Sequence, residues 1–107
     1  MLFRSDVSAN TSLKELSCYK NQLTNLDVTR NTNLTGLGCG YNNISGNGTN
    51  IINTSFTNSF NGDFEANPQE SGINPAGDFC KVADESAVTH FTANYSTKIP
   101  YGTKYFY

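Results

Sequence analysis

The sequence predicts a mainly β protein, in which a short solenoid of parallel strands is followed by an irregular β-rich segment. The main observation is that a pattern beginning at Asp6 returns 21 positions later. The matched positions are Asp6-Val7 and Asp27-Val28, Asn10-Thr11 and Asn31-Thr32, Leu13 and Leu34, Leu16 and Leu37, Cys18 and Cys39, Asn21 and Asn42, and Leu23 and Ile44. A period in the twenties is typical of stacked structural repeats.

The second observation is a strand-like alternation inside each copy. In Leu16-x-Cys18 the period of 2 predicts a strand whose apolar side chains point to one side. The asparagine that follows, Asn21 or Asn42, suits a bend because its amide can satisfy backbone groups that the bend leaves unpaired. We therefore expect the two copies to form parallel neighbouring strands, with each asparagine stacked on the next.

The order Leu13-x-x-Leu16-x-Cys18-x-x-Asn21-x-Leu23, which returns from Leu34 to Ile44, resembles the leucine-rich repeat in the short 21-residue variant of Bacteroidetes surface proteins. The resemblance implies a leucine-rich-repeat solenoid located outside the cell or at the cell surface, which binds a protein or a glycan through its sheet. Stacked repeats usually number three or more and carry atypical ends as caps. With two uncapped copies, the array suggests a piece of a longer protein.

The outward-facing positions of the two copies differ, and they form the candidate binding surface. The first copy presents Glu15, Ser17 and Tyr19, whereas the second presents Gly36, Gly38 and Gly40 beside Tyr41. Two interpretations are open. The glycines indicate either a degenerate repeat weakened by backbone entropy, or a bare backbone that a flat partner such as a sugar ring or another sheet approaches closely.

The positions of the three cysteines predict buried side chains rather than a disulfide or a metal site. Cys18 and Cys39 occupy an inward position of the repeat, where a free cysteine acts as a small hydrophobe. Cys80 stands alone, and there is no Cys-x-x-Cys spacing to suggest a zinc site. Parallel stacked side chains are poorly oriented for a disulfide.

Three segments are predicted: the repeats in residues 1–46, a degenerate third repeat or linker in residues 47–59, and a β-rich segment in residues 60–107. The middle segment is interpreted from Asn53-Thr54-Ser55-Phe56, which is similar to Asn31-Thr32-Asn33-Leu34 with a shift of 22 positions.

The third segment opens with Asn61-Gly62-Asp63-Phe64-Glu65, which resembles the first strand of galactose-binding-like jelly rolls, including several carbohydrate-binding modules. The resemblance implies an incomplete jelly roll. It also makes Asp63 and Glu65 candidate ligands of a structural calcium ion, while no other cofactor is expected. An ordinary turn that leads into a strand explains the same residues equally well.

Apolar and polar residues alternate from Ala87 to Tyr95, and this alternation predicts a half-buried strand with His90 on its polar side. A lone histidine without a partner in motif spacing indicates a surface residue more than a catalyst. The end of the chain is rich in aromatic residues, Tyr101 and Tyr105 among them. They suit a packed strand; the alternative is a stacking platform for sugars or an edge for self-assembly.

Composition and the absence of known motifs limit the range of possible functions. The net charge of −2 argues against binding of nucleic acid, because no excess of basic residues is present to hold phosphate groups. No apolar stretch is long enough to predict a membrane span. No catalytic or phosphate-binding motif occurs. We therefore expect a non-enzymatic interaction module that binds protein or glycan. The alternatives are a fragment of a carbohydrate-binding module and a structural protein that assembles with copies of itself.

Overall fold

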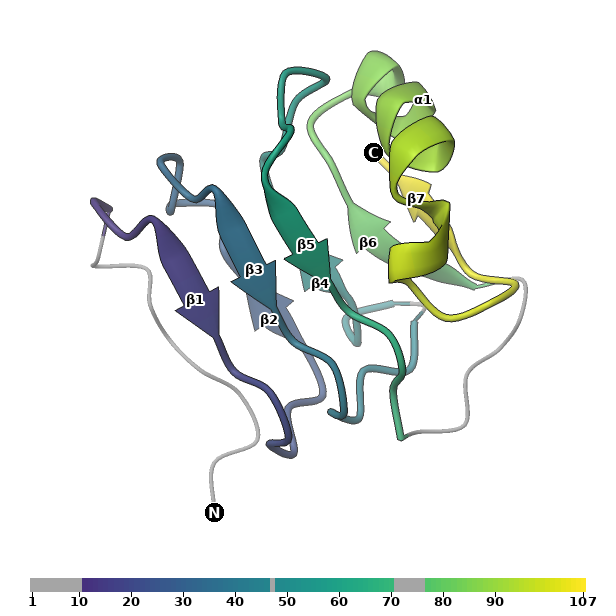
Figure 1. Cartoon of the computed structure of the whole chain (residues 1–107). Coiled ribbons are helices and arrows are strands. Elements are labelled where there is room, and N and C mark those ends of the chain that lie inside the picture. The colour runs from purple at the N-terminus through teal and green to yellow at the C-terminus, as the bar shows by residue number, and fades with distance from the viewer. Residues whose placement is uncertain (1–10, 47, 71–76) are drawn as a thin grey trace.

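The computed structural model describes residues 11–46, 48–70 and 77–107, in which seven strands form two parallel sheets (Figure 1). The front sheet contains, in spatial order, β1 (Glu15–Ser17), β3 (Gly36–Gly38) and β5 (Asp63–Glu65). The back sheet contains β2 (Leu26–Asp27), β4 (Ile52–Asn53), β6 (Asp78–Lys81) and β7 (Lys104–Phe106). From β1 to β6 the chain therefore alternates between the two sheets.

The register of the front sheet confirms the predicted pairing of the two repeat copies. Leu16 of β1 lies opposite Leu37 of β3, and Leu37 in turn lies opposite Phe64 of β5. The strand β5 is thus a third copy, at a spacing of 27 residues that the sequence analysis missed. The predicted equivalence of Asn53 with Asn31 is wrong, because Asn53 pairs with Asp27 in the back sheet.

The predicted asparagine ladder is also present. The Asn42 amide nitrogen donates to the carbonyl oxygens of Cys18 at 2.9 Å and Cys39 at 3.0 Å, and its oxygen accepts from the Leu23 N–H at 3.1 Å. Gln69 does the same one rung later, since it donates to the Cys39 carbonyl and accepts from the Ile44 N–H. These amides satisfy backbone groups at the bends that a buried chain would otherwise leave unpaired.

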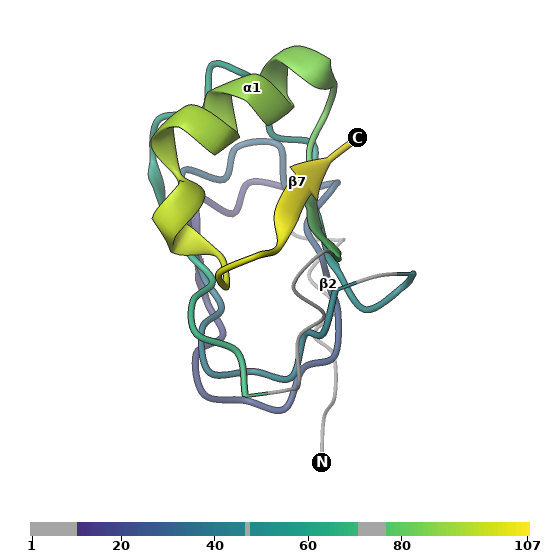
Figure 2. The ribbon, with the colours of Figure 1, turned by 90° about the vertical axis from the view of Figure 1, so that its right-hand side faces the viewer.

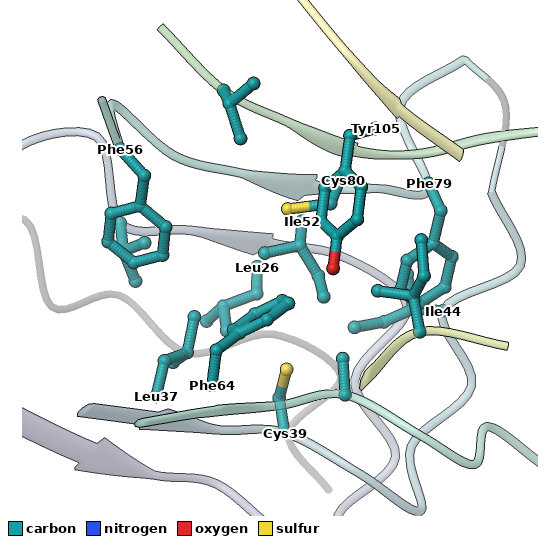
Figure 3. Packing of buried hydrophobic residues seen from close by; sticks show 14 of the residues in the cluster. Leu26, Leu37, Cys39, Ile44, Ile52, Phe56, Phe64, Phe79, Cys80 and Tyr105 are labelled. Carbon is teal, nitrogen blue, oxygen red and sulfur yellow. The ribbon is translucent and has the colours of Figure 1, made fainter. Parts of the chain in front are cut away.

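The hydrophobic core lies between the sheets (Figure 3). Leu37, Cys39 and Phe64 point inward from the front sheet and its continuation, and Ile52, Cys80 and Tyr105 point inward from the back sheet. At about 1.5–3 kcal/mol for each large apolar side chain removed from water, this layer is the main source of stability. The outward face of the front sheet is left to polar residues and glycine.

A helix and a short 3-10 turn lie at the β5 edge of the front sheet, beside β7 of the back sheet (Figure 2). The helix α1 (Glu85–Asn94) begins because the side chain of Asp84 accepts a hydrogen bond from the Ala87 N–H at 2.9 Å. It buries Ala87 and Phe91, which lie four residues apart on one helical face. The turn η1 (Ser96–Lys98) follows, and its last carbonyl accepts the Ala66 N–H at 2.9 Å, beside β5.

The predicted fold class, a mainly β leucine-rich-repeat solenoid followed by an irregular β-rich segment, is wrong. The described residues form a small α/β structure with two parallel sheets and one α-helix, and they indicate no solenoid. The strand predicted from Ala87 to Tyr95 is instead α1, because the apolar spacing of Ala87 and Phe91 fits a helix and Asp84 supplies its N-cap.

Residues 60–107 do not form the predicted jelly roll. A jelly roll is built from antiparallel strands, whereas every strand pair in the described part of the chain is parallel. The strands β5, β6 and β7 extend the sheets begun by the repeats. Among the described residues, the ten-residue α1 is the longest helix, and none could cross a membrane.

Candidate functional site

The outer face of the front sheet carries a depression of about 600 Å³, here called the front trough. Its floor is the backbone of β3, because this strand presents only Gly36 and Gly38 to the outside. Its walls come from the neighbouring elements and include Glu15 and Ser17 of β1, Asp63 and Glu65 of β5, and Tyr95 and Lys98 beyond the helix. The strand order β1-β3-β5 therefore places a bare strand between two strands with polar side chains (Figure 1).

The three predicted glycines are not equally open. A Cβ added to Gly36 would lie 3.2 Å from Cγ of Glu15, and one added to Gly40 would lie 3.4 Å from the Tyr19 ring and 3.2 Å from the Asn67 carbonyl oxygen. A Cβ at Gly38 would meet only the Ser17 hydroxyl, 4.0 Å away. The bare surface expected from the sequence is thus confined to the backbone around Gly38.

The walls of the front trough are acidic. Glu15 and Asp63 lie opposite Gly36 on its two sides, and Glu65 lies opposite Gly38. Among the described residues, Lys98 is the one basic residue that lines the trough, and its ammonium lies 3.5 Å from the Glu65 carboxylate. Three carboxylates against one ammonium leave a net charge of −2. This ion pair is about half exposed, so it contributes little to stability.

Tyr95 forms a fixed part of the trough wall. Its hydroxyl donates to the Gly62 carbonyl oxygen at 2.8 Å, and its ring stacks on Phe91 with centroids 4.9 Å apart. Burial and the neighbouring carboxylate of Asp63 raise the pKa of Tyr95 above its ordinary value. The phenol therefore stays protonated and holds the strand that carries Asp63 against the helix.

The predicted residues Tyr19 and Tyr41 meet at the end of the front sheet. Their rings form an edge-to-face pair with centroids 5.4 Å apart, and the ammonium of Lys20 lies 5.9 Å and 5.6 Å from the two ring centroids. Tyr19 is 47% exposed, so it offers an accessible aromatic edge beside Gly40. The cation–π contacts already hold Lys20 in place.

Tyr101 and Tyr105, also predicted as binding residues, do not line the trough. Tyr105 points into the core, where it is 4% exposed, and its hydroxyl donates to the Tyr95 carbonyl oxygen at 2.8 Å. Burial raises its pKa strongly. The prediction that Tyr105 belongs to the binding surface is wrong, because strand alternation turns its side chain inward, whereas a binding role of Tyr101 stays a prediction. Tyr101 lies in the turn before β7 and is 98% exposed.

Asp63 and Glu65, the predicted calcium ligands, both point outward from β5, since Phe64 between them points inward. Glu65 is occupied by Lys98. Within the described ranges, no three His, Cys, Asp or Glu side chains gather closely enough to hold a metal ion. Calcium binding at these two residues stays a prediction.

The cysteines confirm the prediction of burial. Cys18, Cys39 and Cys80 are all buried free thiols. Burial raises the pKa of Cys18 to about 11 and raises the pKa values of Cys39 and Cys80 well above the ordinary value of a thiol. Because the thiolate is the nucleophile, these side chains are packing residues near neutral pH.

His90 lies on α1 rather than on a strand. Its Nε2 faces the carbonyl oxygen of Phe60, which can only accept, so Nε2 donates. Its Nδ1 then accepts from the side-chain amide of Asn94 at 3.2 Å. Both ring nitrogens are therefore engaged: Nε2 fastens the helix to the loop that carries Phe60, and Nδ1 contacts Asn94 on the same helix.

A second depression, here called the end pocket, has a volume of about 420 Å³ and was not anticipated from the sequence. It lies where the loops that enter β3 and β5 meet, and none of the described residues that line it is charged. Its buried lining includes Val28, Leu34 and Phe56, and Phe60 forms a half-buried wall. The available signal was the pair Phe56 and Phe60 among hydroxyl and amide residues, at the junction between the segment interpreted as a repeat or linker and the predicted β-rich segment.

No family model, curated protein or solved structure matches this chain.

The two depressions share one residue, Gly62, which lines both. A Cβ at this position would collide with the carbonyl oxygen of Thr35. That oxygen also accepts the N–H of Asp63 at 3.0 Å. The close approach of these two backbone segments joins the acidic face to the uncharged pocket.

Proposed function

We propose that the chain is a non-enzymatic binding module that holds an extended segment of a partner protein, rich in lysine or arginine, in the front trough. The observation that carries the proposal is the glycine floor of the trough, open at Gly38, together with walls that carry three carboxylates and one ammonium. The proposal favours a protein over a glycan because a neutral glycan gains nothing from the net negative charge of these walls.

The bare floor supports an extended partner. The backbone groups of β3 are shared with β1 and β5, so a partner cannot add to this strand as a new strand. It can lie across the face, where the missing side chain at Gly38 lets another backbone come closer than the usual spacing of about 10 Å between packed sheets.

The charge of the walls supports a cationic partner. Glu15 and Asp63 stand on strands separated by two strand spacings, about 10 Å. Basic side chains that alternate along an extended segment can reach both walls, and the acidic surface raises the rate of encounter with such a segment.

The state of the potentially reactive side chains supports binding rather than catalysis. The thiols are buried and protonated, and both ring nitrogens of His90 are hydrogen-bonded. Glu15 and Asp63 have the glycine floor between them rather than a nucleophile.

The test uses an eight-residue peptide with lysine at alternate positions, and fluorescence anisotropy on the full chain. Binding should weaken by about tenfold or more in Glu15→Gln/Asp63→Asn, which removes two of the wall charges. It should also be blocked by Gly38→Val, which fills the floor at a position where a Cβ meets only Ser17.

The matched control is Glu70→Gln, which removes an exposed carboxylate that lines neither depression. This variant should bind the peptide as the wild type does. An equal loss in Glu70→Gln, or unchanged binding in both trough variants, would contradict the proposal.

A further inference from the structure

The end pocket has the size and shape of a site for a single ring. Its volume of about 420 Å³ lies within the range of about 300–1,000 Å³ that is usual for small-molecule sites. It is formed by segments distant in sequence, since Val28 and Leu34 come from the loop before β3, and Phe56 and Phe60 come from the loop before β5.

The lining is divided by depth. Three buried side chains, Val28, Leu34 and Phe56, present carbon to the bottom of the pocket. The buried Asn31 also lines it and already has a contact of its own within the protein. All exposed lining residues carry a hydroxyl or an amide, and they are Thr32, Thr35, Ser55, Thr57, Ser59 and Asn61. A ligand that fits must therefore be apolar at its inner end and polar at the mouth.

The pocket excludes charge on energetic grounds. None of its lining residues is ionisable, so a charged ligand would lose hydration without gaining a partner of opposite charge. A pure hydrocarbon fits less well at the mouth, because it would cover hydroxyl and amide groups without hydrogen-bonding to them. A neutral ring with one polar group satisfies both requirements.

The aromatic wall is held in place before any ligand arrives. The ring of Phe60 stacks on that of Phe56 with centroids 4.2 Å apart. Its centroid lies 5.6 Å from that of Phe91 and 5.9 Å from that of Tyr95. Its carbonyl oxygen accepts from His90. Because these contacts fix the loop, the protein loses little conformational freedom when a ring packs against Phe60.

We infer that the end pocket binds a phenol-type ring, with the ring between Leu34 and Phe60 and its hydroxyl at the mouth near Ser59 and Asn61. The same chemistry is available from a free phenol and from a tyrosine side chain of a partner. The binding of such a ring does not depend on the proposed function, because the pocket and the floor of the front trough are lined by different residues apart from Gly62. Only the titration that identifies the source of the ring rests on the peptide binding of the proposed function.

The probe is p-cresol, titrated into the full chain and followed by two-dimensional NMR of backbone amides. We expect saturable binding with a dissociation constant of about 1 mM, which corresponds to about 4 kcal/mol. The shifts should be confined to the loops that line the pocket. The charged analogue p-toluenesulfonate should bind at least about tenfold more weakly.

Two variants test the assignment. Phe60→Leu removes the aromatic wall, and Asn61→Ala removes a rim amide at an exposed position where folding is not at stake. Both should weaken p-cresol binding, whereas Gly38→Val should leave it unchanged. Loss of binding in Gly38→Val would assign the probe to the front trough and overturn the inference.

The source of the ring is decided by a second titration. The lysine peptide is compared with one in which a single residue is replaced by tyrosine. A gain in affinity that Asn61→Ala abolishes assigns the pocket to a partner's tyrosine, whereas p-cresol binding without that gain assigns it to a free phenol. No saturable p-cresol binding, or equal binding of the sulfonate, would overturn the inference.

Discussion

The front trough and the end pocket lie on either side of Gly62, yet they are built in opposite ways. The trough has a backbone floor and charged walls, because β3 places glycine between the carboxylates of β1 and β5. The pocket has a floor of buried side chains and an uncharged rim. The properties of a sheet face follow from the side chains that its strands direct outward. The properties of a pocket between loops follow instead from the core side chains that the loops leave accessible.

The strongest way to break both depressions at once is Gly62→Ala. The new methyl group would collide with the Thr35 carbonyl oxygen, so backbone segments must move apart. We expect a loss of about 3 kcal/mol in the free energy of unfolding, at the upper end of the cost of overpacking. Urea unfolding followed by circular dichroism measures it.

The matched control for that prediction is Gly38→Ala, where the nearest atom to the new methyl group is the Ser17 hydroxyl at 4.0 Å. Its free energy of unfolding should change by no more than about 0.5 kcal/mol. Equal effects of the two substitutions would contradict the packing argument.

A smaller loss is expected at the asparagines that support the end of the front sheet. Asn42 is fully buried and hydrogen-bonds across two rungs, whereas Asn21 is exposed. Asn42→Ala leaves the buried Leu23 N–H without its acceptor and removes one of the two side-chain donors from each of the Cys18 and Cys39 carbonyl oxygens. It should cost about 2–3 kcal/mol, against about 1 kcal/mol or less for Asn21→Ala. Thermal unfolding of the two variants would show this order, and the reverse order would contradict the ladder.

Ionic strength separates the two depressions without a mutation. Between about 0.05 and about 0.5 M salt, screening should weaken binding of the lysine peptide by about tenfold or more. Binding of p-cresol should not weaken, because its pocket lacks charge. Isothermal titration at both ionic strengths checks this, and a parallel loss for both ligands would show that they share one site.

The smallest effect is expected at the N-terminus of α1, a helix whose residues line neither depression. The hydrogen bonds that Asp84 accepts from the Ala87 N–H and from Ser86 lower the pKa of its carboxyl. A lowered pKa stabilises the fold above the unfolded value of about 3.9, and this contribution is lost as the pH falls through the folded value.

Asp84→Ala should therefore lower the melting temperature at pH 7, and the difference from wild type should shrink toward pH 2. Asp84→Asn is the matched variant, since asparagine is an equally good N-cap. It should retain most of the stability at pH 7. A deficit of Asp84→Ala that stays constant with pH would argue against this role of the carboxylate.

The parts of the fold that could be predicted are those where local pattern and packing agree. Leu16 and Leu37 share a strand period and a fixed spacing, so their pairing follows from the repeat. The third copy was missed because its spacing grows to 27 residues and because Phe64 and Gln69 replace the leucine and asparagine of the pattern. The pairing of β5 with β3 therefore keeps the geometry of the first two copies, although the sequence pattern of β5 differs from theirs.

The helix was mistaken for a strand because the residues from Ala87 to Tyr95 satisfy two periods. The alternation of apolar and polar residues was coincidental, whereas the spacing of Ala87, Phe91 and Tyr95 by four residues matches the buried face of α1. The cap at Asp84 was the local signal that favoured the helix. The acidic and glycine positions of the trough were visible in the sequence, but the end pocket depends on two loops that meet only in the folded chain.

The central claim is that two adjacent depressions bind ligands of opposite character independently. The most direct test is an NMR titration of Gly38→Val and Phe60→Leu with both probes, the lysine peptide and p-cresol. The account predicts that Gly38→Val loses the peptide and keeps p-cresol, while Phe60→Leu keeps the peptide and loses p-cresol. If either variant loses both ligands while its spectrum remains that of a folded protein, the two depressions are not independent sites and the account is contradicted.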